Sequence, residues 1–464
     1  MKEMIDVKDK YSGEVIGRVP SVSPEQVPSI IEMAFKAFAR YLETLPLHRR
    51  AEILTEAASL IRRRQDDFAK LIAREAGKPI KYSRKEATRA SLTMQLSAEE
   101  AKRLHGETIP FDAEPRGEDR TGYWFRVPAG LVLAITPFND PLNLVAHKLG
   151  PAVAAGNTVV LKPSSLTPLS AIRLVGTLQE AGLPEDYIHV VTGEGEKLGP
   201  ELVSNPNVRV VTFTGGVDAG QKIARLAGLK KIALELGSNC PVIVMEDASL
   251  DLTAACVLDA GYNCQGQNCI HAQRILIHES RYEELVARLV EGTKKLKVGN
   301  PLDESTDVGP MIAESEAARV EEWVDEALKS GANVMVGGER HGTIYLPTIL
   351  TDVPKDAKVA TEEVFGPVMI VSKFQKMPDA IQESNSTSYG LHAGIFTKST
   401  DNALRAISKL NFGSVLINDT SDFRVDFMPF GGMKHSGLGR EGVRFAIEET
   451  MTEIKTVIFR KPIA

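Results

Sequence analysis

The sequence has no long apolar run and no surplus of basic residues. Its most apolar stretch, Val127–Phe138, is short and contains two prolines, so it cannot cross a bilayer. The formal net charge of −6 leaves no excess of cations to neutralise a phosphate backbone. We therefore expect neither a membrane nor a nucleic acid as a partner.

Cysteine is scarce, and the amino terminus carries no visible export signal. The first ten residues mix acidic and basic side chains without an apolar segment, so we expect no signal peptide. The four cysteines (Cys240, Cys256, Cys264 and Cys269) contain no CxxC pair of the kind found at zinc sites. We expect a cytoplasmic protein with free thiols and no bound metal.

What is present is the composition of an ordinary globular protein. Hydrophobic residues make up 43% and charged residues 25% of 464 residues, which is enough chain for about three domain-sized units. The first third is mostly helical in pattern. Apolar side chains from Ile53 to Ile72 recur close to every 3.6 residues and predict one helix, which ends at Gly77-Lys78-Pro79.

From Gly130 onward, short apolar runs alternate with helical segments. The runs predict five buried strands: Val132–Thr136, Thr158–Leu161, Ile188–Val191, Val208–Phe213 and Ile232–Leu234. Between them, Pro168–Ala181 and Val217–Leu226 have helical patterns. This alternation predicts a parallel sheet that is covered on both faces and binds its ligand at the carboxyl ends of the strands.

A second alternation follows Glu235 and predicts a second α/β domain. Its expected strands are Pro241–Met245 and Arg274–His278, and its expected helices are Ala254–Cys264 and Arg281–Lys295.

Two further strands, Thr121–Val127 and Glu453–Phe459, belong to neither alternation. Because unpaired strand edges promote aggregation, we expect them to pair with each other or with a second subunit.

Two segments have the residues of a phosphate-binding site. Gly215 and Gly216 join a strand to a helix, where backbone N–H groups can approach a phosphate, although the spacing is not GxGxxG. Lys162 ends another strand and can donate to ribose or phosphate oxygens. Considered alone, a structural turn explains the two glycines equally well, and a solvated surface lysine is the favoured interpretation of Lys162.

Three residues have the chemistry of a thiol enzyme. Cys269 follows a glycine-containing turn and is a candidate nucleophile, although most free cysteines are inert buried thiols. Glu235 follows an apolar run, where burial would raise its pKa and suit a general base. Asn139 lies in a loop between two prolines and can donate to an oxyanion. A solvent-facing carboxylate and a loop-capping amide are the alternatives.

The order of these motifs along the chain resembles the aldehyde dehydrogenase superfamily, and the resemblance covers nearly the whole sequence. The motifs are ITPFNDP, KPSS, FTGG, ELGS, GQNC, EEVFGPV (Glu362–Val368) and PFGGMKHSGLGREG (Pro429–Gly442). The segment before PFGG is similar to the branch with lactaldehyde, non-phosphorylating glyceraldehyde-phosphate and phosphonoacetaldehyde dehydrogenases.

The resemblance implies a role for each matching residue. Cys269 is the expected nucleophile, Glu235 the general base, and Asn139 the side-chain half of an oxyanion hole that the Cys269 N–H completes. NAD or NADP is the expected cofactor, bound by the following residues: Thr136, Lys162, Ser165, Phe213, Gly215, Gly216, Leu236, Glu363 and Phe365.

The resemblance also implies an α/β architecture with three parts. We expect a Rossmann-like dinucleotide-binding domain at 1–112 and 128–236, a catalytic α/β domain at 237–436, and β strands for oligomerisation at 113–127 and 445–464. A homodimer or homotetramer is the expected assembly.

Four positions depart from the family's common pattern. Phe138 stands where relatives often have tryptophan, and Asp140 where they have an apolar or aromatic residue. Ser165 replaces a glutamate that binds the adenosine ribose in many NAD-preferring relatives, so we expect both NAD and NADP to bind. Asn268 stands where anion-binding relatives can have an arginine.

The substrate tail is the least defined part of the predicted site. Arg424, with Asp140 nearby in the predicted site, is a candidate to face it, and a guanidinium would suit a carboxylate, sulfonate, phosphonate or phosphate. Pairing of Arg424 with Asp422 or Asp426 is the alternative.

Three rival functions remain open at this point. A coenzyme-A-acylating aldehyde dehydrogenase would not need Glu235. A thiol hydrolase built on Cys269 and His271 would leave Gly215 and Lys162 unexplained. A non-enzymatic scaffold would need none of the three catalytic candidates.

Overall fold

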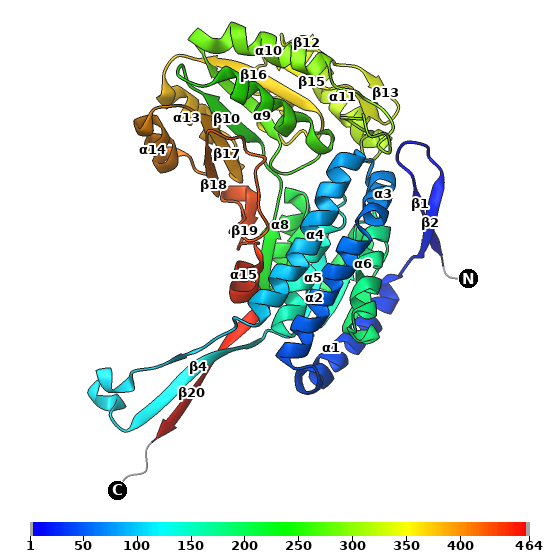
Figure 1. Cartoon of the computed structure of the whole chain (residues 1–464), viewed down its shortest axis with the longest axis vertical. Helices are drawn as coiled ribbons and strands as arrows, with labels where there is room; N and C mark the ends of the chain where they lie inside the picture. Colours follow the sequence, from blue (N-terminus) through cyan, green and yellow to red (C-terminus); the bar gives the residue numbers. More distant parts are fainter. Residues whose placement is uncertain (1–2, 461–464) are drawn as a thin grey trace.

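The computed structural model describes residues 3–460 and contains two α/β units and a projecting arm (Figure 1). The first unit carries the amino-terminal helices, the second lies at the opposite end of the molecule, and strands β4 and β20 form the arm. This arrangement confirms the predicted fold class of two α/β units with a β arm.

The first unit is built on a six-stranded sheet. Its strands, in spatial order, are β19 (Gly437–Leu438), β9 (Lys231–Glu235), β8 (Val208–Thr214), β5 (Leu131–Ile135), β6 (Val159–Lys162) and β7 (Ile188–Val190). All neighbours are parallel except β19, which is antiparallel to β9. The chain starts at β5, extends through β6 and β7 to one side, and returns to the other side at β8. The strand order therefore reverses beside β5, where open α/β sheets bind their ligands.

Helices cover both faces of this sheet, as the strand–helix alternation predicts. One apolar core unites the sheet with helices α2 (Leu47–Arg63), α3 (Gln65–Ala76), α4 (Ile80–Ala101), α5 (Asn143–Ala155) and α6 (Pro168–Glu180). A second core lies on the other face, against α1 (Val27–Thr44), α7 (Gly195–Ser204) and α8 (Val217–Ala227). None of the described helices is long and apolar enough to span a membrane.

The single helix predicted around Ile53–Ile72 is wrong, because the structure divides this segment into α2 and α3. Arg64 leaves the helical conformation, with φ −111° and ψ 24°, and the chain turns there. The apolar period continues across the turn because both helices bury the same side against the sheet. Gly77 ends α3 as predicted, in a left-handed conformation with φ 71°.

The second unit is built on a seven-stranded sheet. Its order is β12 (Asn333–Val336), β15 (Thr348–Thr351), β16 (Val368–Phe374), β11 (Ala272–His278), β10 (Cys240–Val244), β17 (His392–Phe396) and β18 (Ser414–Ile417). Only β12 runs antiparallel to its neighbour. Helices α9 (Leu250–Tyr262) and α10 (Tyr282–Lys294) pack in one core, and α13 (Met377–Asn385) and α14 (Thr400–Lys409) pack in another. Helix α11 (Glu314–Lys329) packs in a third core together with β15 and β16.

The two strands that the sequence left unassigned pair with each other. β4 (Arg120–Pro128) and β20 (Thr452–Arg460) are antiparallel in a register that joins Pro128 to Thr452 and Arg120 to Arg460. A short strand, β3 (Glu107–Thr108), pairs with the other side of β4. β3 therefore adds two residues to the arm sheet that the predicted division gave to the nucleotide domain. That division stays a prediction, and residues 461–464 lie outside the described residues.

We predict that the arm joins subunits through β20. This strand is an edge of its sheet, and Ile454, Ile458 and Phe459 expose apolar side chains there. Ile454→Lys with Ile458→Lys should lower the molar mass measured by light scattering, whereas Leu229→Lys, at an exposed position on the body, should not. Truncation after Thr450 should give insoluble protein, because β4 would lose its long partner. A fully active unsubstituted monomer would contradict the prediction.

Candidate active site

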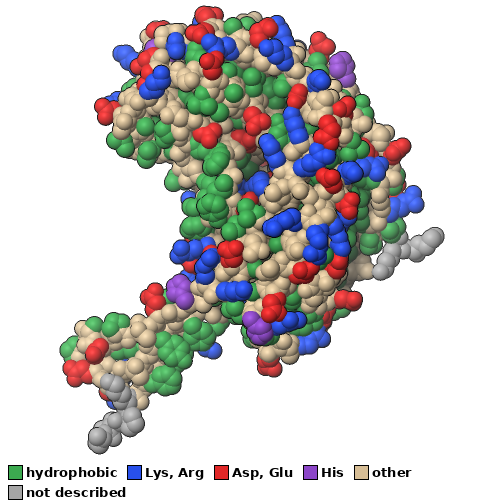
Figure 2. Space-filling model, in the orientation of Figure 1, with side chains coloured by type: hydrophobic (Ala, Val, Ile, Leu, Met, Phe, Trp, Pro, Cys, Tyr) green, Lys and Arg blue, Asp and Glu red, His purple; other side chains and the backbone are tan. Residues whose placement is uncertain are grey.

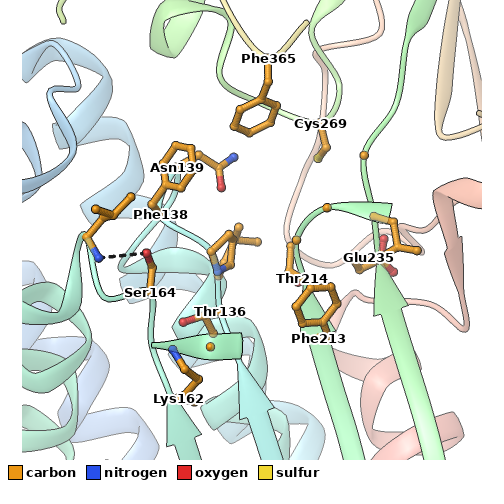
Figure 3. Close-up of a pocket in the computed structure, with 18 of the residues that line it drawn as sticks. Thr136, Phe138, Asn139, Lys162, Ser164, Phe213, Thr214, Glu235, Cys269 and Phe365 are labelled. Atoms are coloured by element: carbon orange, nitrogen blue, oxygen red, sulfur yellow. Dashed lines mark hydrogen bonds between the residues drawn. The ribbon is translucent and has the colours of Figure 1, made fainter. Parts of the chain in front are cut away.

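One pocket collects nearly all of the predicted site residues (Figure 3). It has a volume of about 650 Å³ and lies between the two sheets. The first sheet contributes residues at or just beyond the carboxyl ends of β5, β6, β8 and β9: Thr136, Lys162, Gly215 and Glu235. The second sheet contributes residues that precede β10, β11 and β16: Gly237, Cys269 and Glu363. The carboxyl edge of one sheet therefore faces the amino edge of the other across the cavity.

Cys269 lies in the loop between α9 and β11. The loop turns sharply at Cys264, Gln265 and Gly266, whose φ angles are all positive. At Gly266 a Cβ would lie 2.1 Å from the Gly366 carbonyl oxygen, so only glycine lets the two loops approach. Burial raises the pKa of the Cys269 thiol well above its ordinary value, and the charge of Arg424 opposes this shift.

Two hydrogen-bond donors near the Cys269 thiol are without partners. The Asn139 side chain makes no hydrogen bond with another described residue, and neither does the backbone N–H of Cys269. Figure 3 shows Asn139 and Cys269 facing the same space. Such a pair of free donors can stabilise negative charge that develops on an oxygen between them.

Glu235 ends β9 with its carboxylate buried. Within residues 3–460, neither carboxylate oxygen has a hydrogen-bond partner. Burial raises the pKa of Glu235 well above its ordinary value, the negative charge of Glu441 raises it further, and Arg424 and Lys148 oppose the shift. A Cβ on Gly431 would lie 3.0 Å from Glu235 Oε1, so the PFGG segment closes over this carboxylate. A proton-free Glu235 would be a strong base in this site.

Glu441 holds two cations at the wall of the pocket. It accepts hydrogen bonds from Lys148 Nζ at 3.0 Å and from Arg424 Nη2 at 3.0 Å. These partners hold the pKa of Glu441 well below its ordinary range despite its burial. The Arg424 guanidinium also stacks 3.8 Å from the centre of the Phe430 ring.

The structure shows which ion pairs Arg424 and Asp140 form and which of the two residues lines the pocket. Arg424 lines the pocket, and its ion pair is with Glu441, so pairing with Asp422 or Asp426 is wrong. Asp140 does not line the pocket, because it pairs with the buried cation of Lys78 and with Arg89. Its expected place in the substrate site is therefore wrong.

The predicted nucleotide residues extend through the pocket from Phe365, which lies beside Cys269, to Lys162 at the other end (Figure 3). Lys162 and Ser165 line it, and burial lowers the pKa of Lys162 to about 8. Glu363 accepts a hydrogen bond from the Ser238 N–H at 2.9 Å, and burial raises its pKa to about 8. Among the residues described, the hydroxyls of Thr136 and Thr214 are buried without partners. These unpaired groups fit a bound polyhydroxy ligand.

Two glycines give the pocket its shape. At Gly215 a Cβ would lie 2.5 Å from the Phe213 ring, and at Gly237 a Cβ would lie 2.0 Å from the Glu363 carboxylate. Any larger residue would displace a lining side chain. Gly216, Leu236 and Phe365 also line the pocket, as predicted. Phe365 meets the Phe138 ring edge to face at 5.7 Å.

Sequence reasoning missed four acidic residues of the pocket, and one of them, Glu316, lies in the first turn of α11. Glu441 lies in the quoted GREG motif, whose carboxylate was the available signal. Glu194 and Glu196 flank Gly195 at the start of α7, and nothing in their pattern marked them as pocket residues. His271 and Arg274, which follow Cys269 in the sequence, do not line the pocket and make hydrogen bonds elsewhere. His271 Nε2 lies 3.0 Å from the Gly261 carbonyl oxygen, and Arg274 donates to Asn239.

The chain is similar over almost its whole length to proteins of one family. The sequence profile described as the aldehyde dehydrogenase family matches residues 1–457. Aspartate-semialdehyde dehydrogenase 1 of Pseudomonas canavaninivorans is 49% identical, over 98% of this chain and 96% of the relative. The 3-sulfolactaldehyde dehydrogenase of Priestia aryabhattai is 45% identical, over 98% of this chain and 95% of the relative.

A solved structure agrees with this similarity. Glyceraldehyde-3-phosphate dehydrogenase GapN from Methanocaldococcus jannaschii, complexed with NADP, superposes with a TM-score of 0.95 at 41% identity. The match covers 99% of this chain and 100% of the archaeal chain.

A buried lysine holds Glu86 and Asp140 together outside the pocket, which yields a stability prediction. Lys78 pairs with Glu86 at 2.5 Å and with Asp140, and its side chain is 3% exposed. Lys78→Met leaves the buried Glu86 carboxylate without its cation and Asp140 with Arg89 alone, and should cost about 3–5 kcal/mol in the free energy of unfolding. Lys81→Met, which breaks the more exposed pair with Asp307, should cost about 0–1 kcal/mol. If urea denaturation showed equal losses of unfolding free energy for both variants, the buried ion pairs would stabilise the fold no more than the exposed pair does.

Proposed function

The chain belongs to the aldehyde dehydrogenase family and is an NAD(P)-dependent enzyme, and from this premise we propose that it oxidises a small polar aldehyde to its carboxylate. In this proposal Cys269 forms a thiohemiacetal and then a thioester, Asn139 stabilises the oxyanion, and Glu235 activates the water that releases the acid.

The observation that carries this proposal is the set of side chains that line the same cavity as Cys269. Its thiol, the free Asn139 amide and the unpaired Glu235 carboxylate all line one cavity. Nucleophile, oxyanion donor and base are the groups that acyl transfer through a thioester requires.

Acylation begins when the Cys269 thiol loses its proton to solvent. Arg424 favours the thiolate electrostatically, against the burial that disfavours it. The thiolate adds to the aldehyde carbon, and the resulting alkoxide accepts hydrogen bonds from the Asn139 amide and the Cys269 N–H. Loss of hydride from that carbon leaves the thioester.

The nucleotide end of the pocket fits NAD or NADP. We propose that Lys162 and Ser165 hold the adenosine ribose, that the backbone at Gly215 and Gly216 meets the phosphates, and that Glu363 holds the nicotinamide ribose. When bound, the nicotinamide ring supplies the hydride acceptor.

Deacylation needs water and a base. Glu235 takes a proton from water, and the resulting hydroxide attacks the thioester carbon and expels the Cys269 thiolate. Because burial raises the pKa of Glu235, its carboxylate is a stronger base than an exposed one.

Arg424 supports a substrate whose tail accepts hydrogen bonds. Its Nη2 is engaged by Glu441, while its Nε is buried without a partner within the described part of the chain. A carboxylate, sulfonate or hydroxyl on the substrate would satisfy that donor. The relatives named for aspartate semialdehyde and 3-sulfolactaldehyde act on aldehydes of this kind. Asn268 contributes no second cation.

The rival functions fit the site less well. A coenzyme-A-acylating enzyme would leave the buried Glu235 carboxylate without a purpose. A thiol hydrolase would need His271 beside Cys269, yet His271 contacts Gly261 and burial lowers its pKa to about 4. A scaffold would have no reason to bury Glu235 without a partner, since this destabilises the fold.

We predict that Cys269→Ala abolishes aldehyde oxidation. The loss should be at least about 10³-fold, because no other thiol lines the pocket among the residues described. Cofactor binding, followed by fluorescence, should persist. Cys264→Ala is the matched control and should remain active. If only Cys264→Ala inactivated the enzyme, Cys264 rather than Cys269 would be the nucleophile.

We also predict that Glu235→Gln separates the two half-reactions. Rapid mixing should show one equivalent of NAD(P)H in a burst, followed by turnover slowed about 10²–10⁴-fold. Burial raises the pKa values of Cys269 and Glu235, and both act without their protons, so the rate of the unsubstituted enzyme should rise with pH. In Glu235→Gln the rate of the burst should still rise with pH, because deprotonation of Cys269 is still required. A slow first turnover without a burst would place Glu235 in an earlier step.

A further inference from the structure

We propose that the adenosine end of the pocket selects NAD over NADP, with Glu196 and Ser165 as the determinants. The inference rests on the proposed nucleotide site and narrows it. NADP differs from NAD by a phosphate on the adenosine 2′-hydroxyl, so selection depends on charge and hydrogen bonding around that oxygen.

The Ser165 hydroxyl already donates its proton in a hydrogen bond within the protein. Its Oγ lies 2.6 Å from the carbonyl oxygen of Gly193, and a carbonyl can only accept, so Ser165 must donate to it. The remaining capacity of Ser165 is to accept a hydrogen bond. A ribose 2′-hydroxyl can donate to Ser165, whereas an ionised phosphate cannot. The expectation from sequence that Ser165 offers a donor to a 2′-phosphate is therefore revised.

The same hydrogen bond joins two loops at this end of the pocket. Ser165 belongs to the segment after β6, and Gly193 belongs to the segment that leads into α7. A Cβ on Gly195 would lie 3.9 Å from Lys162 Nζ, so the start of α7 borders the lysine expected at the ribose. Glu194 and Glu196, on either side of Gly195, line the pocket there.

The charges at this end disfavour another anion. The amino terminus of α7 would by itself attract a phosphate, but Glu196 occupies its first turn. Glu194 is paired with Lys197 at 2.9 Å, whereas Glu196 has no ion-pair partner among residues 3–460. Lys162 is the cation on this side, and burial lowers its pKa to about 8, which weakens its hold on a phosphate.

One hydroxyl nearby can still donate. Ser164 Oγ accepts from the Leu166 N–H at 3.2 Å (Figure 3) and keeps its own proton. A single neutral donor does not offset the repulsion between a phosphate, at about −1.5 to −2 charge, and a nearby carboxylate. The archaeal GapN structure holds NADP, so this fold can accept the 2′-phosphate, and local residues must decide between the two cofactors.

The test compares two probes that differ only in the 2′-phosphate. Calorimetric titration of the full-length protein with 5′-AMP and with 2′,5′-ADP should show 5′-AMP binding at least about tenfold more tightly at low salt. Glu196→Gln should narrow this ratio about three- to tenfold by strengthening 2′,5′-ADP binding, and Glu196→Lys should reverse it. Glu201→Gln makes the same charge change later on α7, outside the pocket, and should leave the ratio unchanged.

The outcomes separate the two levels of the proposal. Equal binding of both probes, or a ratio that Glu196→Gln does not move, would overturn the selectivity while leaving the nucleotide site in place. If neither probe binds and NAD does not bind either, the nucleotide site itself would be overturned. Ser165→Ala should weaken 5′-AMP, which loses its acceptor, more than 2′,5′-ADP, and the opposite order would contradict the role given to Ser165.

Discussion

The buried carboxylate of Glu441 is the contact on which the geometry of the site depends. It joins Lys148 of α5, in the first unit, to Arg424, which lies in the segment after β18 of the second unit. Since removing one partner of a buried ion pair leaves an uncompensated charge, each of these residues fixes the other two. Arg424 in turn supplies the positive field that acts on Cys269 and Glu235. The electrostatics of the pocket are therefore set by the same pairs that hold its walls together.

Charged side chains of both signs are interspersed over the surface (Figure 2). A second network of charged residues, by contrast, is largely buried and continues away from the pocket. Asp426 accepts from His147 at 2.9 Å and from Arg89 at 2.9 Å, and Arg89 reaches Asp140. Asp140 completes the series at Lys78. The residue that departs from the family's common pattern at position 140 thus pairs with Lys78 and Arg89 and does not line the pocket.

Sequence patterns predicted the parts of this structure that depend on local periodicity. The five predicted strands of the first sheet appear within one residue of their expected ends, because unbroken apolar runs bounded by turns have few other stable conformations. The catalytic candidates came from motifs, and all of them line the pocket. What the sequence did not reveal is pairing across distance: Glu441 and Lys148 are separated by 293 residues, and no local pattern relates them. The break at Arg64 was missed because both helices bury one continuous apolar stripe.

Under the proposed mechanism, the position of Cys269 explains why the site is built from two α/β units. A single parallel sheet gathers ligand-binding residues at its carboxyl edge, and there the first unit has the glycine turn, Lys162 and Glu235. The second unit presents Cys269 and Glu363 from loops that enter its strands, so the two groups face the first sheet rather than lie beside it. In the proposed mechanism, an aldehyde between the units would meet the Cys269 thiol from the second unit and the Glu235 carboxylate from the first. The unpaired polar groups that destabilise this region, above all the Glu235 carboxylate, are the ones that the proposed chemistry would use.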